Sequence, residues 1–303
     1  MSDVRRVVED DPGPDTGYTI VVAVANPDRV EQLMRTAVDV AAAHDGRIRV
    51  VSVVHKPATS PFLLFSEERI EREFATDRRA VLDRAVAAAD DSGVPVERSL
   101  LVGSDVADAV LSAVADAGAD AVLLGWQDRS RPSDVVLGTT VDPVLRRAPC
   151  DVFVERVGRT ADGMDGILLP TDGGPHAATA SDLARAVARA NAAAVTVVSY
   201  VPPDAAADAR EAARDRVTAT ADRLSGVAVE TDVREAAAVG DAIATDADAH
   251  DLVVLGATRE GGIRPRVVGS VARTVGRRAA PPVVIAKRRS DASLVDRALR
   301  RLW

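Results

Sequence analysis

Short runs of apolar, mostly β-branched residues alternate along this chain with longer Ala-rich segments in which apolar residues recur every three or four positions. The first kind is typical of strands in a parallel sheet covered on both faces, and the second kind is typical of helices. In the first half the pattern predicts strands at 18–25, 47–54, 96–102, 121–125 and 151–155, and helices at 28–44, 66–91, 105–117 and 138–147. In the second half it predicts strands at 166–171, 194–201, 227–234, 251–256 and 282–287, and helices at 175–191, 204–224, 240–248 and 269–279. Because strand and helix alternate strictly, we predict right-handed βαβ units and an α/β fold of two doubly wound, five-stranded parallel-sheet domains.

The two halves also share a spacing of individual residues. Four positions of the first half recur 131 positions later: Gly125, Asp128, Gly138 and Thr139 correspond to Gly256, Arg259, Gly269 and Ser270. In each half the first glycine ends an apolar run, and the last pair opens a predicted helix. Such agreement indicates a duplicated domain, and we place the two copies at residues 18–156 and 165–288.

Two terminal segments lie outside the copies. We expect residues 1–17 to form a disordered tail, because they are polar and contain Pro12, Pro14 and three consecutive acids. Residues 289–303 place leucine and valine on one stripe of a predicted helix, which makes an amphipathic C-terminal tail. That tail would dock on its own domain or, alternatively, on a partner or a membrane surface.

Composition narrows the range of functions. The chain has 303 residues and a formal net charge of -8, so it lacks the basic field with which proteins bind nucleic acid nonspecifically. No apolar run reaches the roughly 18 residues of a membrane span, and the first residues do not resemble a secretion signal, so we expect a cytoplasmic protein without stable membrane insertion. Cys150 is the only cysteine, and the four histidines are far apart in sequence, so we predict neither a metal site nor a catalytic residue.

The loop that follows Gly256 has the chemistry of an anion site. A strand ends in this glycine, and the next predicted helix opens with Gly269 and Ser270. The first N–H groups of a helix have no acceptors inside the helix, and its dipole adds partial positive charge there. Asp172 ends the first strand of the same copy, at the carboxyl edge where ligands enter such sheets. The alternative is a glycine loop with a purely structural role.

These residues are similar to a known family. The sequence Pro170-Thr171-Asp172-Gly173, together with the spaced Gly256 and Gly269-Ser270, resembles the universal stress protein domain, and the chain as a whole is similar to a tandem member over about 18–288. The resemblance implies an adenine nucleotide alpha hydrolase-like fold whose two copies form a pseudo-dimer. It also implies that the protein binds ATP or AMP, either with or without Mg²⁺. The site residues it implies are Pro170, Thr171, Asp172, Gly256, Thr258, Arg259, Gly269, Ser270 and Val271.

The two copies depart from the family's pattern differently. The pattern's second glycine is Arg259 in copy two, where a guanidinium would lie near phosphate, and Asp128 in copy one. Two unit charges about 4 Å apart repel by roughly 4 kcal/mol at an effective dielectric near 20, which is a large part of the roughly 8 kcal/mol of a micromolar affinity. Copy one also has Asn26-Pro27 after its first strand and no carboxylate like Asp172. We therefore predict one nucleotide site per chain, in copy two.

Three functions fit this sequence. The leading hypothesis is a nonenzymatic stress-response protein that binds adenine nucleotide. The alternative is a ligand-free partner of a membrane transporter that acts by protein contacts, and the third is a slow ATPase. The last strand of each copy, 151–155 and 282–287, is an apolar edge, so we expect these two strands to pair, either within the chain or across a homodimer.

Overall fold

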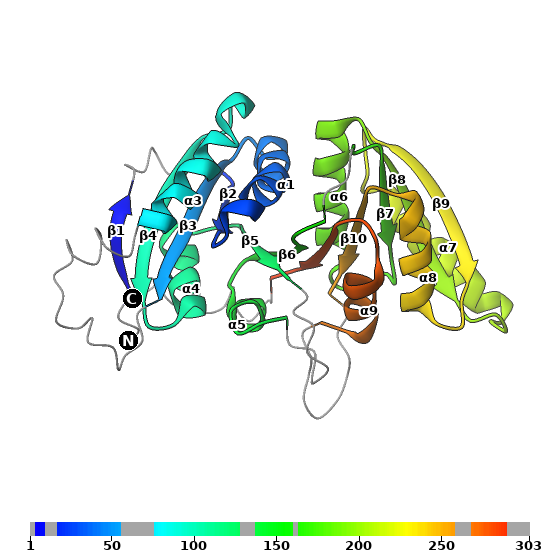
Figure 1. Cartoon of the computed structure of the whole chain (residues 1–303). Coiled ribbons are helices and arrows are strands. Elements are labelled where there is room, and N and C mark those ends of the chain that lie inside the picture. Colours follow the sequence, from blue (N-terminus) through cyan, green and yellow to red (C-terminus); the bar gives the residue numbers. More distant parts are fainter. Residues whose placement is uncertain are drawn as a thin grey trace, which may run out of the picture. The chain divides into compact units, whose positions relative to one another are not determined.

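The computed structural model describes residues 4–9, 17–55, 76–127, 137–159, 163–257 and 268–289. Contacts divide the chain into two compact units. Unit 1 comprises Met1–Gly125, Val136–Val152 and Arg289–Trp303, and unit 2 comprises Trp126–Val135 and Phe153–Arg288. Each unit is built around one sheet with helices on both faces (Figure 1).

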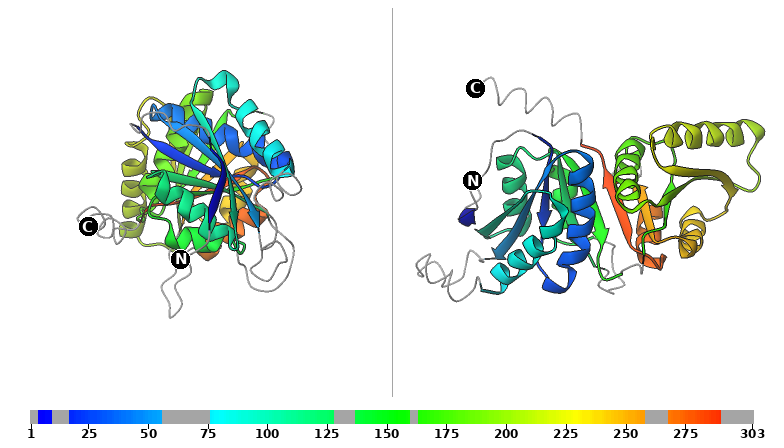
Figure 2. Two further views of the ribbon diagram at one scale, coloured as in Figure 1. Left: turned by 90° about the vertical axis from the view of Figure 1, so that its left-hand side faces the viewer. Right: turned by 90° about the horizontal axis from the view of Figure 1, so that it is seen from above.

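The sheet of unit 1 has the strand order β1-β4-β3-β2-β5. Its strands are β1 (Arg5–Glu9), β2 (Thr19–Ala23), β3 (Arg47–His55), β4 (Val96–Gly103) and β5 (Ala121–Trp126). Its helices are η1 (Pro27–Arg29), α1 (Val30–Ala43), α3 (Thr76–Ala87), η3 (Asp90–Ser92), α4 (Val106–Asp116) and α5 (Val141–Arg147). Helix α1 packs with α3 on one face, and α4 packs with α5 on the other, as the two views of Figure 2 show.

The N-terminal segment differs from expectation. We predicted a disordered tail over 1–17 and an all-parallel sheet, but Arg5–Glu9 form strand β1, which pairs antiparallel with β4. Strand β1 therefore covers the N–H and C=O groups on the outer edge of β4, which would otherwise be open to pairing with another chain. The secondary structure of unit 1 therefore begins before Tyr18.

The sheet of unit 2 has the order β6-β11-β10-β7-β8-β9. Its strands are β6 (Asp151–Arg156), β7 (Gly166–Pro170), β8 (Ala194–Val201), β9 (Ala228–Glu235), β10 (Leu252–Gly256) and β11 (Val283–Lys287). Its helices are α6 (Ala177–Asn191), α7 (Ala207–Ala221), α8 (Val239–Asp246), η4 (Ala247–Ala249) and α9 (Ser270–Arg278). Residues Phe153–Arg156 of β6 belong to this unit, so the expected pairing of the two final strands, β6 with β11, is confirmed.

The duplication is visible in the hydrogen bonds of the strands. In unit 1 the Asp120 carboxylate accepts a hydrogen bond from Thr19 N at 3.0 Å. The equivalent Asp251, again 131 positions later, accepts from Asp165 N at 2.8 Å and from Gly166 N at 3.0 Å. In both units an aspartate before the fourth strand of the repeat therefore fixes the start of the first strand, β2 or β7.

Strand order also positions the candidate site. In unit 2, β7 lies between β8 and β10. The chain runs from β7 through α6 to β8 on one side of β7, and it reaches β10 on the other side only after β9 and α8. Strand β7 pairs with β10 only at Ile167 and Leu168, whereas it pairs with β8 from Gly166 to Pro170, and Thr171 N continues this pairing by donating to Val198 O at 2.8 Å. The carboxyl ends of β7 and β10 therefore form the switch point at which doubly wound sheets bind ligands.

Some expectations concern residues outside the described part of the chain. The expected helix at 66–91 is described as α3 from Thr76, and the amphipathic tail lies outside the described residues apart from Arg289. Among the described helices, none has the length and apolar character needed to cross a membrane.

Candidate functional site

The loop after β7 forms one side of the site. Pro170 ends the strand, and Thr171 is buried, with its hydroxyl 3.0 Å from that of Thr220 on α7 and accepting from Gly173 N at 3.2 Å. Asp172 is exposed, and its Oδ1 accepts from Gly174 N at 2.7 Å. Two successive side-chain-to-backbone bonds thus hold the loop in a tight turn, with Asp172 at the carboxyl edge of the sheet.

His176 joins this loop to the end of β10. It stands just before α6, is 5% exposed, and accepts at Nδ1 from Arg288 N at 3.1 Å. A Cβ placed on Gly256 would lie 3.1 Å from Cβ of His176, so a glycine is needed for the approach of the two segments. The sequence alone does not predict a role for His176, because this role depends on a strand that is distant in sequence.

Helix α9 provides the other side. Gly269 is buried and extended (φ -67°, ψ 169°) directly before the helix, Ser270 is exposed in its first turn, and Val271 is half-buried. No acidic residue lies in this first turn. Arg273 follows it and donates to Val268 O at 3.0 Å. The predicted residues Thr258 and Arg259 lie outside the described residues. The described ones therefore provide a helix start suited to an anion.

The equivalent segment of unit 1 is built differently. Gly138 has φ +127°, and helix α5 begins only at Val141, so the glycine does not precede the helix directly as Gly269 does. The counterpart of Arg273 is Asp142, in the first turn of α5. Burial raises the pKa of its carboxyl, while Arg146 and the Leu137 N–H oppose the rise. A carboxylate in this place would repel a bound phosphate.

A model of the universal stress protein family matches residues 18–156 and, a second time, residues 164–287. The chain belongs to the universal stress protein family. A universal stress protein of Thermus aquaticus is 32% identical over 141 residues, which cover 46% of this chain and 98% of that protein.

Solved structures show the same fold over both universal stress protein domains. One from Archaeoglobus fulgidus covers 89% of this chain and 98% of its own, with a TM-score of 0.63 and 16% identity. The cytoplasmic domain of a prokaryotic cation chloride cotransporter covers 92% of this chain and 99% of its own, with a TM-score of 0.57 and 11% identity. At these identities the likeness shows the fold alone.

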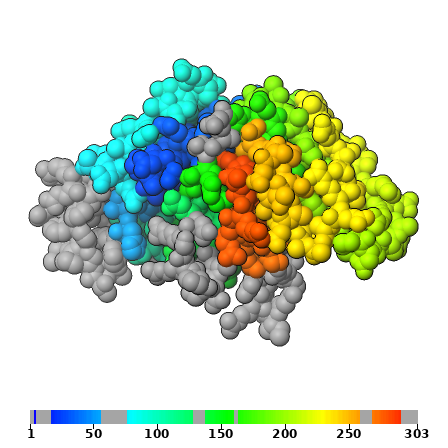
Figure 3. Space-filling model, turned by 45° about the vertical axis from the view of Figure 1, so that its right-hand side comes forward, coloured from blue at the N-terminus to red at the C-terminus, as the bar shows by residue number. Residues whose placement is uncertain are grey.

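Two contacts fix α9 within unit 2. Trp126 is 6% exposed, and a Cβ on Gly276 of α9 would lie 2.8 Å from its Cζ3. The buried Arg156 guanidinium donates to Ala279 O at 2.6 Å and to Arg277 O at 3.4 Å, at the C-terminal end of α9. A cation there is favourable to the helix dipole. Helix α9 also packs along α8, and their orange and gold surfaces adjoin in Figure 3.

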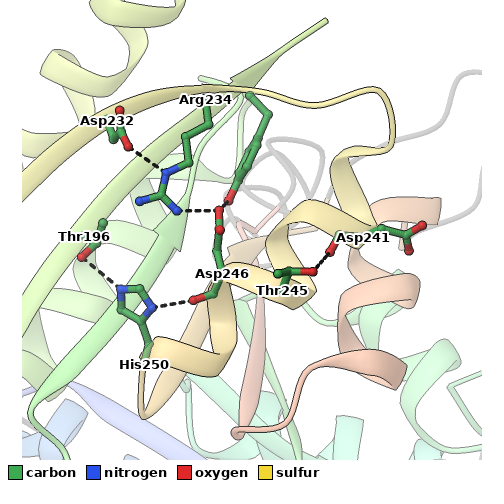
Figure 4. A network of polar contacts seen from close by, with 8 residues as sticks. Thr196, Asp232, Arg234, Asp241, Thr245, Asp246 and His250 are labelled. Atoms are coloured by element: carbon green, nitrogen blue, oxygen red, sulfur yellow. Dashed lines mark hydrogen bonds and ion pairs between the residues drawn. The ribbon is translucent and has the colours of Figure 1, made fainter. Parts of the chain in front are cut away.

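A second polar cluster of this universal stress protein domain lies between β8, β9 and α8 (Figure 4). Arg234 bonds Asp232 and Asp246 at 2.7 Å each, and Tyr200 donates to the same Asp246. Burial and the hydrogen bond to Asp246 raise the Tyr200 pKa, so the phenol stays protonated. His250 Nδ1 donates to Asp246 O at 2.9 Å. Because these ionisable groups are paired, we interpret the cluster as structural.

Proposed function

We propose that this tandem universal stress protein binds adenine nucleotide, as AMP or ATP, in unit 2 and that it acts in the stress response without catalysing a reaction. The observation that supports this most is the placement of Asp172 after β7 and of the acid-free start of α9 after β10, the two strands between which the strand order of unit 2 reverses. In this proposal the phosphate lies against the N–H groups of Ser270 and Val271, where the helix dipole favours negative charge.

Asp172 would hold the ribose. Its Oδ1 is used by Gly174 N, while its Oδ2 has no hydrogen bond to another described residue and can accept from a ribose hydroxyl. His176 would keep the β7 loop close to Gly256, so that Asp172 and the α9 start stay at a fixed distance. The described histidines, cysteine and acids contain no cluster of three or more that could hold a metal, so a Mg²⁺ ion would enter with the ATP phosphates.

Unit 1 would not bind nucleotide. The late start of α5 and the carboxylate of Asp142 support this, in addition to the Asn26-Pro27 sequence after β2. We therefore propose one nucleotide per chain, bound inside the cell, with the partner-contact function as the alternative if nothing binds.

Isothermal titration calorimetry with AMP and ATP tests the proposal. We expect micromolar to millimolar affinity and a stoichiometry near one. Gly269→Val should abolish measurable binding, because a β-branched side chain blocks close approach to the helix start, and Asp172→Asn should weaken it while keeping the turn. Gly163→Val, in the connector, is the control. No heat with either nucleotide would refute the binding, a stoichiometry of two would refute the asymmetry, and phosphate release from ATP would refute the nonenzymatic role.

A further inference from the structure

Helix α7 lies over the β7 loop and brings an arginine to it. The aliphatic part of Arg216 covers Gly173: a Cβ on this glycine would lie 2.8 Å from Cδ and 2.9 Å from Cγ of the arginine. One turn further along α7, Thr220 contacts Thr171. Gly173 also has φ +69°, which favours glycine independently of the contact. Arg216 is therefore held against Gly173 of the β7 loop, next in sequence to Asp172.

The Nε atom of Arg216 has no hydrogen-bond partner in the described part of the chain, which is also true of Nε in Arg29 and Arg185. This Nε atom is itself buried, while the Arg216 residue as a whole is half-buried. The nearest acid in sequence to the contact, Asp172, accepts from Gly174 N instead. A buried donor without an acceptor is unfavourable, and such groups in folded proteins usually have a partner. The arrangement fits a donor that is satisfied by a ligand.

We propose that Arg216 recognises the base of the bound nucleotide by donating to an acceptor nitrogen of a purine. This inference rests on the proposed function. If the phosphate lies at Ser270 and the ribose at Asp172, the base continues past the β7 loop toward α7, which is where Arg216 lies. The residue thus contributes to specificity for the nucleoside and not to binding of the phosphate.

The test compares AMP with adenosine, which lacks the phosphate, by NMR titration of the full chain. Arg216→Met keeps the aliphatic packing on Gly173 and removes the donors. The matched control is Arg189→Met, because Arg189 lies over another glycine with positive φ, Gly226, with Nη2 2.9 Å from its Cβ position. We expect Arg216→Met to lower both affinities by the same factor, about tenfold, which corresponds to roughly 1.4 kcal/mol. We expect Arg189→Met to change neither.

Each other outcome overturns the proposal in its own way. A loss for AMP alone would make Arg216 a phosphate ligand, and no loss for either would make it a packing residue. If Gly269→Val and Asp172→Asn abolish or weaken AMP binding while Arg216→Met does not, the proposed function stands and the role of Arg216 is refuted. If the unsubstituted chain binds neither AMP nor adenosine, both are refuted. Thermal unfolding of each variant identifies a loss of fold, and Arg216→Gln then replaces the methionine variant.

Discussion

Substituting Gly276 by alanine tests how tightly α9 is held in unit 2. Alanine inside a helix is favoured over glycine by about 1 kcal/mol, so the local effect is stabilising. The new Cβ, however, would lie 2.8 Å from Cζ3 of Trp126 and 3.2 Å from Cη2, well below the roughly 3.5–4.0 Å of a favourable carbon contact. The indole is a rigid ring and is 6% exposed, so it has little room to move.

Overpacking of this kind costs about 1–3 kcal/mol, which exceeds the gain in helix propensity. We expect Gly276→Ala to lower the free energy of unfolding by about 1 kcal/mol and the Tm by about 2–4 °C. Chemical and thermal denaturation followed by circular dichroism measure both. In a Trp126→Leu background the clash is gone, and the same alanine should raise the free energy of unfolding by up to about 1 kcal/mol. The effect of Gly276→Ala on stability therefore changes sign between the two backgrounds of the double-mutant cycle.

The control is Gly163→Ala, where the nearest atom to the new Cβ would be Asp165 Oδ2 at 3.7 Å. Its Tm should stay the same or rise slightly. If Gly276→Ala raises the Tm of the unsubstituted chain, or if the effect is equal in both backgrounds, the contact between Trp126 and α9 does not constrain the helix and the reasoning is wrong.

Three further substitutions test other parts of the fold. Asp142→Asn should raise the Tm at pH 7 and lose this effect as the pH falls toward 3.8, because a raised carboxyl pKa means that the ionised form opposes folding; a Tm series against pH measures it. Glu97→Ala should destabilise unit 1 by about 3 kcal/mol in urea denaturation, since Glu97 bonds Arg49 at 2.8 Å and Arg47 at 3.3 Å in a buried site; a loss below about 1 kcal/mol would contradict this. Tyr200→Phe should cost about 1–2 kcal/mol without changing AMP affinity, and a loss of binding would show that the cluster around Asp246 serves the site.

The sequence predicted the strands well because a parallel sheet buried on both faces needs continuous apolar runs. Strand β1 was missed for the converse reason: the sequence Arg5–Glu9 has only two valines between charged residues, and its pairing with β4 uses backbone groups that any sequence carries. Its order depends on the open edge of β4, which is a property of the folded unit.

The candidate site divides in the same way. Asp172 and Gly269 could be predicted, because their positions at a strand end and a helix start are local in sequence. His176 and Arg216 could not, since each acts on a segment that only folding brings near. The difference between Asp142 and Arg273 could also be predicted. These residues lie three positions after Thr139 and Ser270, so they correspond at the same offset of 131 positions.

The contacts of α9 determine where the chain can be divided into its two copies. A protein that starts at residue 164 would contain every residue of the second family match. It would lack Trp126 and Arg156, which pack on Gly276 and cap the carbonyls of Arg277 and Ala279. The sequence repeat and the folding unit therefore have different boundaries, and deletion of the first copy would remove two contacts that hold α9 of the second.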